Sequence, residues 1–328
     1  MRRILVTLLW AAVLTACAKT GLEGTAVRFR IKSDAPAVRA AFSGETDGNG
    51  IERIDWEKGD LIRILSPQAV PTGGESHAAD YRVSSVREDG ASSFASVEPA
   101  EKAGLAWGEG AHDFFAVSPA PSEDNGTSLE ENAFNGLVPS VQNGVPDQSL
   151  ICLLAAARGI EESRDEAVTL AFRPAFTALS FTLSLEDDHP VPLHTFRLES
   201  TGGPVAGPFR ATMDEEGWTF AAYGETADAV SIGLDRTLER DTSVTITVLC
   251  LPLDLSGLKA VFETAYGTKT LTLFRKDGAP LVFPACHKAK ITGLVLPGAP
   301  DISFTVDLTP WDEAGEEIEA ESATHEND

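Results

Sequence analysis

The sequence predicts an all-β protein, and three features of its 328 residues lead to this expectation. Short runs of alternating apolar and polar residues recur along the chain, turn residues separate them, and no stretch keeps a long helical period. Clusters such as Asp47-Gly48-Asn49-Gly50 and Gly202-Gly203-Pro204 are typical turn signals. Many short strands separated by turn residues are typical of β-sandwiches and β-barrels.

The expected strands form two series, which a length near 310 residues without the leader assigns to two domains. The boundary is placed at the charged segment 186–190, which ends in Pro190. Residues 122–149 are polar and are expected to form a long loop, and the only short helix that the pattern allows lies around 149–158. The expected strands are 26–31, 61–65, 81–86, 114–117, 167–172 and 177–185, then 195–198, 229–234, 244–251, 258–263, 269–274, 289–296 and 302–308.

The N-terminus has the layout of a secretory signal: Arg2 and Arg3, then an apolar run over 4–13, then small residues. A run of about ten apolar residues is too short to cross a membrane, which takes about twenty in a helix. The string Leu14-Thr15-Ala16-Cys17 is similar to a bacterial lipobox. We therefore expect a signal peptide over 1–16, cleavage between Ala16 and Cys17, and lipid attachment at Cys17. An ordinary secretion signal that contains Cys17 is the alternative.

Charge excludes one class of partner. The net charge is −24, and it becomes −26 once Arg2 and Arg3 leave with the signal peptide. No basic cluster is present, although nucleic-acid binding requires Lys and Arg to neutralise phosphates, so nucleic acid is excluded as a partner. The tail 311–328 has eight acids and no Lys or Arg, which predicts mobility unless it is bound. The expected domains are thus 17–188 and 189–310, followed by this tail.

Three cysteines remain after Cys17, and an odd number argues against a disulfide-stapled scaffold. Cys250 shares the alternate face of the strand 244–251 with apolar residues, which predicts a small core residue. A pair with Cys286 stays open, and Cys152 has no assigned role.

No catalytic pattern is found. The zinc motif His-Glu-x-x-His, the Gly-x-Ser-x-Gly elbow and a phosphate-binding loop are all missing. His189 and His194 lack a third metal ligand nearby, and Cys286 and His287 are neighbours that face opposite ways in a strand. We therefore expect no cofactor, no metal and no enzymatic activity, with an unrecognised hydrolase as a remote alternative.

Three segments together resemble the fimbrillin family of Bacteroidetes, the exported lipoprotein precursors of pilus subunits and their relatives. They are Val38-Arg39-Ala40 with the later Trp56-Glu57-Lys58-Gly59-Asp60-Leu61-Ile62-Arg63-Ile64, then 112–119, and then 168–181. Within them, Gly59-Asp60 is expected to turn the chain into the strand 61–65, and Trp56 to cover the open end of a sandwich. The resemblance implies two consecutive transthyretin-like Greek-key β-sandwich domains and a place on the outer membrane surface.

The resemblance also implies a mechanism of assembly by strand exchange. An Arg-specific protease cuts after an arginine, the first strand leaves, and a strand of a neighbouring subunit fills the groove. The matching bond here is Arg39-Ala40, in a loop rich in Ala, Ser and Gly, and the departing strand is 26–31. The candidate donor strand carries Ile302, Phe304, Val306 and Leu308 on one face. It can equally be the last strand of the second domain.

Two functions follow as hypotheses. In the first, the chain is a pilus subunit, of the shaft or the tip, whose partners are other fimbrillin subunits and the protease. In the second, it is a non-polymerising surface lipoprotein that binds a glycan or a host protein through loops such as 122–149. The lipid on Cys17 anchors the chain to the membrane in both.

Overall fold

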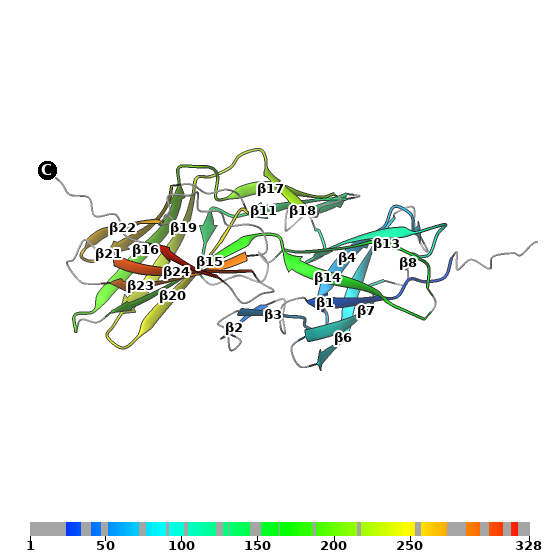
Figure 1. Ribbon diagram of the computed structural model, residues 1–328, viewed down its shortest axis with the longest axis horizontal. Helices are drawn as coiled ribbons and strands as arrows, with labels where there is room; N and C mark the ends of the chain where they lie inside the picture. Colours follow the sequence, from blue (N-terminus) through cyan, green and yellow to red (C-terminus); the bar gives the residue numbers. More distant parts are fainter. Residues whose placement is uncertain are drawn as a thin grey trace, which may run out of the picture.

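The computed structural model describes residues 24–33, 41–46, 52–71, 77–89, 92–101, 104–122, 127–130, 132–144, 152–163, 165–185, 188–214, 218–252, 257–273, 287–295, 302–310 and 316–320. Across these ranges the chain is all-β and contains no helix, as expected. The strands form one closed sheet, three open sheets and two short ribbons. Figure 1 shows the closed sheet at the right end of the molecule and the strands of two open sheets at the left.

The closed sheet comes from the N-terminal half, and pairing of its first and last strands completes it. The β1–β14 pair is parallel, and the other pairs are antiparallel. The ribbons β2 (Ala41–Thr46) with β3 (Glu52–Asp55) and β5 (Val70–Pro71) with β8 (Leu105–Ala106) lie outside this sheet. Its order is β1 (Phe29–Ser33), β14 (Val168–Pro174), β13 (Leu153–Ile160), β9 (His112–Ser118), β4 (Leu61–Leu65), β6 (Ala78–Asp89) and β7 (Ser92–Pro99).

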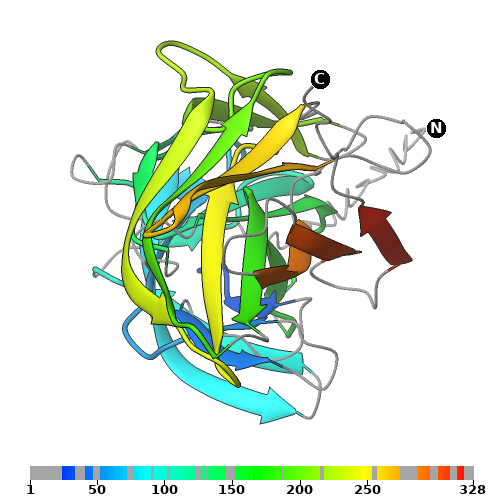
Figure 2. The same cartoon turned by 90° about the vertical axis from the view of Figure 1, so that its left-hand side faces the viewer.

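Two five-stranded sheets make a sandwich in the C-terminal half, seen from its end in Figure 2. Phe181 of one sheet packs 4.9 Å from Phe196 and 6.4 Å from Phe262 of the other, between ring centroids. One sheet is β12 (Val141–Gln142), β19 (Ala229–Leu238), β16 (Val191–Ser200), β21 (Leu258–Thr264) and β22 (Gly267–Leu273). The other is β20 (Ser243–Cys250), β15 (Thr177–Leu185), β23 (His287–Val295), β24 (Ile302–Pro310) and β25 (Glu316–Ala320).

A four-stranded sheet lies between the two ends of the molecule in Figure 1. Phe209 packs 5.9 Å from Phe134 and 6.2 Å from Phe220 within it. Buried apolar side chains of all the large sheets form one continuous cluster, so the described parts share a core. The order of this sheet is β10 (Ser128–Glu130), β11 (Ala133–Val138), β17 (Gly207–Met213) and β18 (Trp218–Ala222).

The segment expected as a loop over 122–149 carries three strands, so this expectation is wrong for its described residues. Strand β11 pairs with β17, and β12 pairs in parallel with β19, which ties the segment to the C-terminal half. The side-chain amide of Gln142 extends this attachment to the opposite sheet. Its Nε2 donates to Leu249 O over 2.8 Å, and its Oε1 accepts from Leu249 N–H over 3.0 Å.

Two further expectations differ from the structure. The sequence places 177–185 at the end of the first domain, but β15 pairs with β20 and β23, so the change between sheets falls between Pro174 and Thr177 rather than at residue 188. The helix expected around 149–158 is wrong, because β13 occupies 153–160 and pairs with β9 and β14. Except for 26–31, of which only 29–31 lies within β1, the expected strands lie wholly or mostly within observed strands, and the bounds of β4 and β15 match those expected.

Candidate functional site

Strand β1 is the element on which the strand-exchange hypothesis depends, and the structure holds it along both edges. Arg30 lies opposite Thr169 of β14 in the parallel pair and opposite Ser96 of β7 in the antiparallel pair. The residues before β1 continue this pairing, since Val27 N–H donates to Leu105 O over 2.9 Å. The expected strand 26–31 is therefore real but shifted: β1 covers 29–33, and Ala26 makes an isolated bridge.

The inward face of this segment is apolar and fully packed. Val27, Phe29 and Ile31 are all buried, with Ile31 at 0% exposure. The ring of Phe29 meets Tyr81 and Phe114 edge to face, each with centroids 5.1 Å apart. Edge-to-face contacts of this kind add to the stabilisation from burial. The three alternate side chains fill one site in the core of the closed sheet.

Tyr81 forms a wall of this site, and its hydroxyl is held within the core. The hydroxyl accepts a 2.7 Å hydrogen bond from Leu105 N–H. Burial raises the pKa of Tyr81 to about 12, while the Leu105 hydrogen bond opposes that rise. The phenol is therefore neutral at physiological pH, and the site occupied by Phe29 is uncharged on this side.

The outward face of β1 is cationic and exposed. Arg30 Nε donates to Thr169 Oγ1 over 2.6 Å, and its guanidinium carbon lies 5.7 Å from the Phe94 ring centroid. These exposed contacts contribute little compared with the inward face. Burial of Val27, Phe29 and Ile31 stabilises the segment by up to about 5–9 kcal/mol in all. A cut downstream of β1 would therefore not release the strand unless another strand took its place.

The proposed cleavage bond lies outside the described residues. Arg39 and Ala40 fall between the end of β1 at Ser33 and the start of β2 at Ala41. Ala16 and Cys17 also lie outside the described residues, so lipid attachment stays a prediction. The sequence order is nevertheless clear: a cut after Arg39 would separate both the lipid site and β1 from the rest of the chain.

The candidate donor segment forms strand β24, which lies inside a sheet and not at its edge. Phe304 is opposite Gly293 of β23 and Ala320 of β25. In the sequence, Ile302, Phe304, Val306 and Leu308 occupy alternate positions of this strand. In this structure β24 is thus a strand of the chain's own sandwich, and donation would require it to leave β23. Strand β1 lies in a different sheet.

The turn at 56–60 has the expected structural role. Gly59 has φ +107°, and its N–H donates to Val83 O over 2.9 Å, which fastens the turn to β6. Asp60 Oδ2 accepts from Glu57 N–H over 2.8 Å, and the chain continues into β4. Trp56 is buried, with its ring centroid 5.0 Å from that of Phe172. These contacts stabilise the fold and do not form a reactive site.

Asp60 provides a test of pH dependence. Burial raises the pKa of Asp60 above its usual value, with the Glu57 N–H hydrogen bond acting against that rise. A carboxyl whose pKa is raised by folding binds its proton more tightly in the folded state, so stability falls as pH rises through the folded pKa. Asp60→Asn keeps an acceptor for Glu57 N–H and removes this ionisation. Denaturant unfolding should therefore show the variant gaining stability over the natural protein between about pH 3 and pH 7. A difference that is constant with pH would contradict the assignment.

His112, at the start of the resembling segment 112–119, is a buried structural residue. Gly108 N–H donates to its Nε2 over 2.9 Å, so Nδ1 carries the proton and donates to Gly110 O over 2.8 Å. Its ring also meets Trp107 edge to face at 4.9 Å. With both nitrogens engaged and 0% of the side chain exposed, His112 is not available as a catalytic base.

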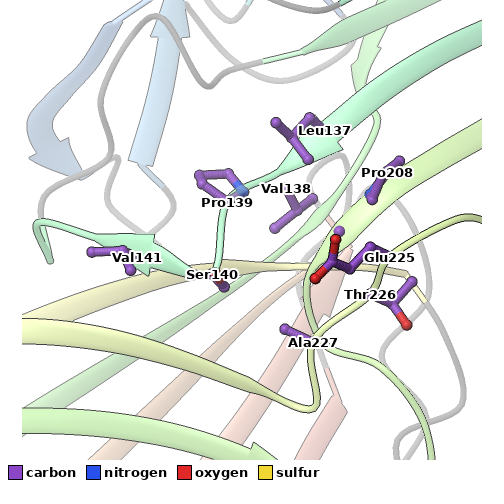
Figure 3. Close-up of a pocket in the computed structure, with 10 residues that line it drawn as sticks. Leu137, Val138, Pro139, Ser140, Val141, Pro208, Glu225, Thr226 and Ala227 are labelled. Atoms are coloured by element: carbon purple, nitrogen blue, oxygen red, sulfur yellow. The ribbon is translucent and has the colours of Figure 1, made fainter.

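A surface recess of about 580 Å³ lies where the four-stranded sheet meets the edge of the sandwich. Figure 3 shows Leu137–Val141 along one side and Glu225, Thr226 and Pro208 on the other. Among the residues that line it, Leu137 is 49% exposed and Val141 is 75% exposed, so the recess presents apolar surface to solvent. The sequence points to 122–149 as a ligand-binding segment. No sequence feature indicates that Pro208 and 225–227 line the same recess, because only the pairing of distant strands places them next to that segment.

The cysteines that the structure describes are inert core residues. Cys152 and Cys250 are free and buried, which confirms the core position of Cys250, while its suggested partner Cys286 lies outside the described residues. Burial raises the pKa of the Cys250 thiol to about 12 and raises the pKa of the Cys152 thiol as well. Because the thiolate is the reactive form, the thiols of Cys152 and Cys250 should not react with thiol reagents in the folded protein.

Thiol labelling checks this expectation. At about pH 8, a free exposed cysteine with pKa near 8.5 reacts readily. In the folded protein, Cys152 and Cys250 should remain unmodified by a thiol reagent for as long as the fold persists, and both should react once denaturant is added. Mass spectrometry of the digested protein would identify the labelled residue. Rapid labelling of Cys250 under folding conditions would contradict the buried position.

Neither a metal centre nor a membrane-spanning helix is found among the residues that the structure describes. Within those ranges, no three His, Cys, Asp or Glu side chains come together as metal ligands would. No helix there is long and apolar enough to cross a membrane. The features that remain as candidates are strand β1, strand β24 and the recess.

This geometry defines the chain as an all-β protein in which a closed sheet and a two-sheet sandwich share one hydrophobic core. Its fold is similar to that of a candidate cell adhesion protein from Bacteroides uniformis, with TM-score 0.57, 17% identity, and coverage of 87% of this chain and 98% of the other. A candidate cell adhesion protein from Bacteroides ovatus gives TM-score 0.55, 14% identity, and coverage of 90% and 98%. The tip fimbrial protein Mfa3 from Porphyromonas gingivalis, with a C-terminal truncation, gives TM-score 0.46, 11% identity, and coverage of 87% of this chain and 100% of the other. No protein-family model and no curated protein matches the sequence. At these identities the likeness concerns the fold.

Proposed function

We propose that this chain is a fimbrillin-like subunit of a surface filament, of the shaft or the tip, which assembles by proteolysis-triggered strand exchange. The observation that carries the proposal is strand β1, which is paired on both edges, buries three alternate apolar side chains and precedes Arg39-Ala40 in sequence. Removal of such a strand leaves an unpaired groove that a new strand can fill. The similarity of the fold to those of two candidate cell adhesion proteins supports this proposal.

The chain is exported, takes a lipid on Cys17 and is held at the outer membrane as a precursor. The described sheets belong to two consecutive transthyretin-like Greek-key β-sandwiches, with β1 as the first strand of the first. An Arg-specific protease cuts Arg39-Ala40, and the lipid site and β1 then leave together when a strand of another subunit enters.

Limited digestion with an Arg-specific protease tests the assembly step. We expect the mature protein to be cut at Arg39-Ala40 and to form a ladder of oligomers in size-exclusion chromatography, because the groove left by β1 recruits another chain. Arg39→Gln is the matched control, since it removes the cleavage site and leaves β1 in place. A protein that is cut at this bond and stays monomeric at high concentration would count against the proposal.

The recess favours a second candidate function, that of a non-polymerising surface lipoprotein that binds a glycan or a host protein. The supporting observation is that the exposed apolar residues Leu137 and Val141 line the same recess as Glu225 and belong to the segment that the sequence indicates for ligand binding. Val141→Arg would fill the recess without touching the core. If this function is correct, the variant should lose binding in a glycan array or a cell-adhesion assay and keep its protease response.

A further inference from the structure

Strand β18 forms one edge of the four-stranded sheet, and it lacks the features that usually protect an exposed edge. Among the residues that the structure describes, only β17 pairs with it. Proteins commonly protect such edges with charged side chains, proline, bulges or a covering segment, because unpaired backbone groups attract other strands. The strand contains neither a charge nor a proline, and its register with β17 has no bulge. Its sequence is Trp218-Thr219-Phe220-Ala221-Ala222.

The hydrogen bonds to β17 determine which backbone groups of β18 face outward. Tyr223 N–H donates to Pro208 O over 3.1 Å, at the end of this antiparallel pair. Because hydrogen-bonded and non-hydrogen-bonded pairs alternate along an antiparallel ladder, every second residue back from Tyr223 also bonds to β17. The intervening residues direct their N–H and C=O groups to the free edge, where an added strand can bond to them. These residues are Trp218, Phe220 and Ala222.

The side chains of this edge continue an aromatic row of the core. Phe209 lies 5.9 Å from Phe134 and 6.2 Å from Phe220, between ring centroids. Phe134 and Phe209 are buried, whereas Phe220 is only partly buried at the edge. Trp218 is also partly buried and packs against the core. The row therefore ends in aromatic surface that apolar side chains of an added strand would cover, and aromatic residues are common anchors of protein interfaces.

Acidic residues flank β18 on both sides. The sequence from 214 to 228 contains five acids and no Lys, Arg or His. Of these acids, Asp214, Glu225 and Asp228 are exposed. Edge-to-edge pairing of two copies of β18 is disfavoured, because an antiparallel pair would bring the acids before one strand against the acids after the other. Charge complementarity instead favours a partner with basic residues.

We propose that the free edge of β18 is a docking site for an extended segment of another protein, with alternating apolar residues between flanking Lys or Arg residues. The segment adds a strand to the four-stranded sheet and places its apolar side chains beside Trp218 and Phe220. Its basic ends lie near the acids that flank β18. This docking requires neither the cut at Arg39-Ala40 nor the departure of β1, so it is independent of the assembly proposed above.

Amide hydrogen exchange, followed residue by residue by NMR, tests whether the edge is free. The Arg39→Gln protein is used, because it cannot enter cleavage-dependent assembly. Without a partner, the Phe220 amide should exchange at least about tenfold faster than the Ala221 amide, which bonds to β17. The synthetic peptide Lys-Lys-Val-Thr-Val-Thr-Val-Lys-Lys should slow exchange at Phe220 and leave Ala221 unchanged. Slow exchange at Phe220 without peptide would overturn the proposal, because the edge would then be paired already.

Calorimetric titration with the same peptide tests the pairing at Ala222. Proline there removes an outward N–H and keeps the hydrogen bonds to β17, so the Ala222→Pro protein should bind at least about tenfold more weakly. Ala222→Ser is the matched control, because it keeps the N–H and should bind as the natural residue does. Equal binding by these two variants, or no binding of the peptide to the unaltered edge, would reject docking at β18.

A second peptide tests the charge of the partner. With Glu in place of each Lys, the peptide should bind at least about tenfold more weakly, because its ends then repel the acids that flank β18. This comparison uses the unaltered edge and so does not depend on the folding of any β18 variant. Equal affinities for the basic and the acidic peptide would reject a basic partner.

Discussion

Replacing Phe29 with alanine is expected to lower the free energy of unfolding by about 3–5 kcal/mol, the range for truncation of a buried phenylalanine. Phe29 is 4% exposed and contacts two aromatic rings edge to face, so alanine leaves a cavity between Tyr81 and Phe114. Because typical domains are stable by only about 5–15 kcal/mol, this loss is large. Urea unfolding of the uncut protein, followed by intrinsic fluorescence, measures it.

The matched control for this prediction is Arg30→Ala on the opposite face of β1. That change removes one exposed hydrogen bond to Thr169 and a contact with Phe94, and it is expected to cost less than about 1 kcal/mol. Similar losses for the two variants would show that β1 is not held by its inward face. A loss below about 1 kcal/mol for Phe29→Ala would contradict the buried position itself.

Replacing Gln142 with alanine is expected to cost about 2–4 kcal/mol, because it leaves two backbone groups of Leu249 without partners. Gln142 both donates to Leu249 O and accepts from Leu249 N–H, and Leu249 is 2% exposed. This amide joins β12, an edge strand of one sheet, to β20 of the facing sheet. The free energy of unfolding by urea is again the measurement.

The neighbouring residue provides the control. Val141 is 75% exposed, so Val141→Ala should change stability by less than about 0.5 kcal/mol, as is usual for surface positions. If the Gln142→Ala and Val141→Ala proteins unfold at the same denaturant concentration, water replaces the lost hydrogen bonds and the amide does not join the two sheets.

Local alternation explains what the sequence could predict about the fold. Strand β15 has the expected bounds because apolar and polar residues alternate along it with period two, a signal that depends only on neighbours in the chain. Strand β4 also has the expected bounds, because its short apolar run directly follows the turn residues Gly59-Asp60. Alternation of apolar and polar residues did not identify strand β13. Its run Ala155-Ala156-Ala157 favours a helix by intrinsic propensity, but pairing with β9 overrides that preference.

Partners distant in sequence explain what could not be predicted. The expected boundary after 177–185 is wrong because β15 pairs with β20 and β23, which come later in the chain. The recess depends on β11 meeting β17, so its far side at Pro208 has no local signature. The short strands β10 and β12 offer too few residues for a periodic pattern.

The sequence by itself determined that this protein is all-β and where strands such as β4 and β15 lie, and it predicted a lipobox at Cys17 and a candidate cleavage bond at Arg39-Ala40. These are properties of adjacent residues. Only the tertiary structure decided that β1 is enclosed between β7 and β14, that its three inward side chains meet Tyr81 and Phe114, and that 128–142 joins the C-terminal half. The physical reason is that hydrogen-bonded pairing and core packing select partners far apart in the chain, and periodicity contains no information about which partner is chosen.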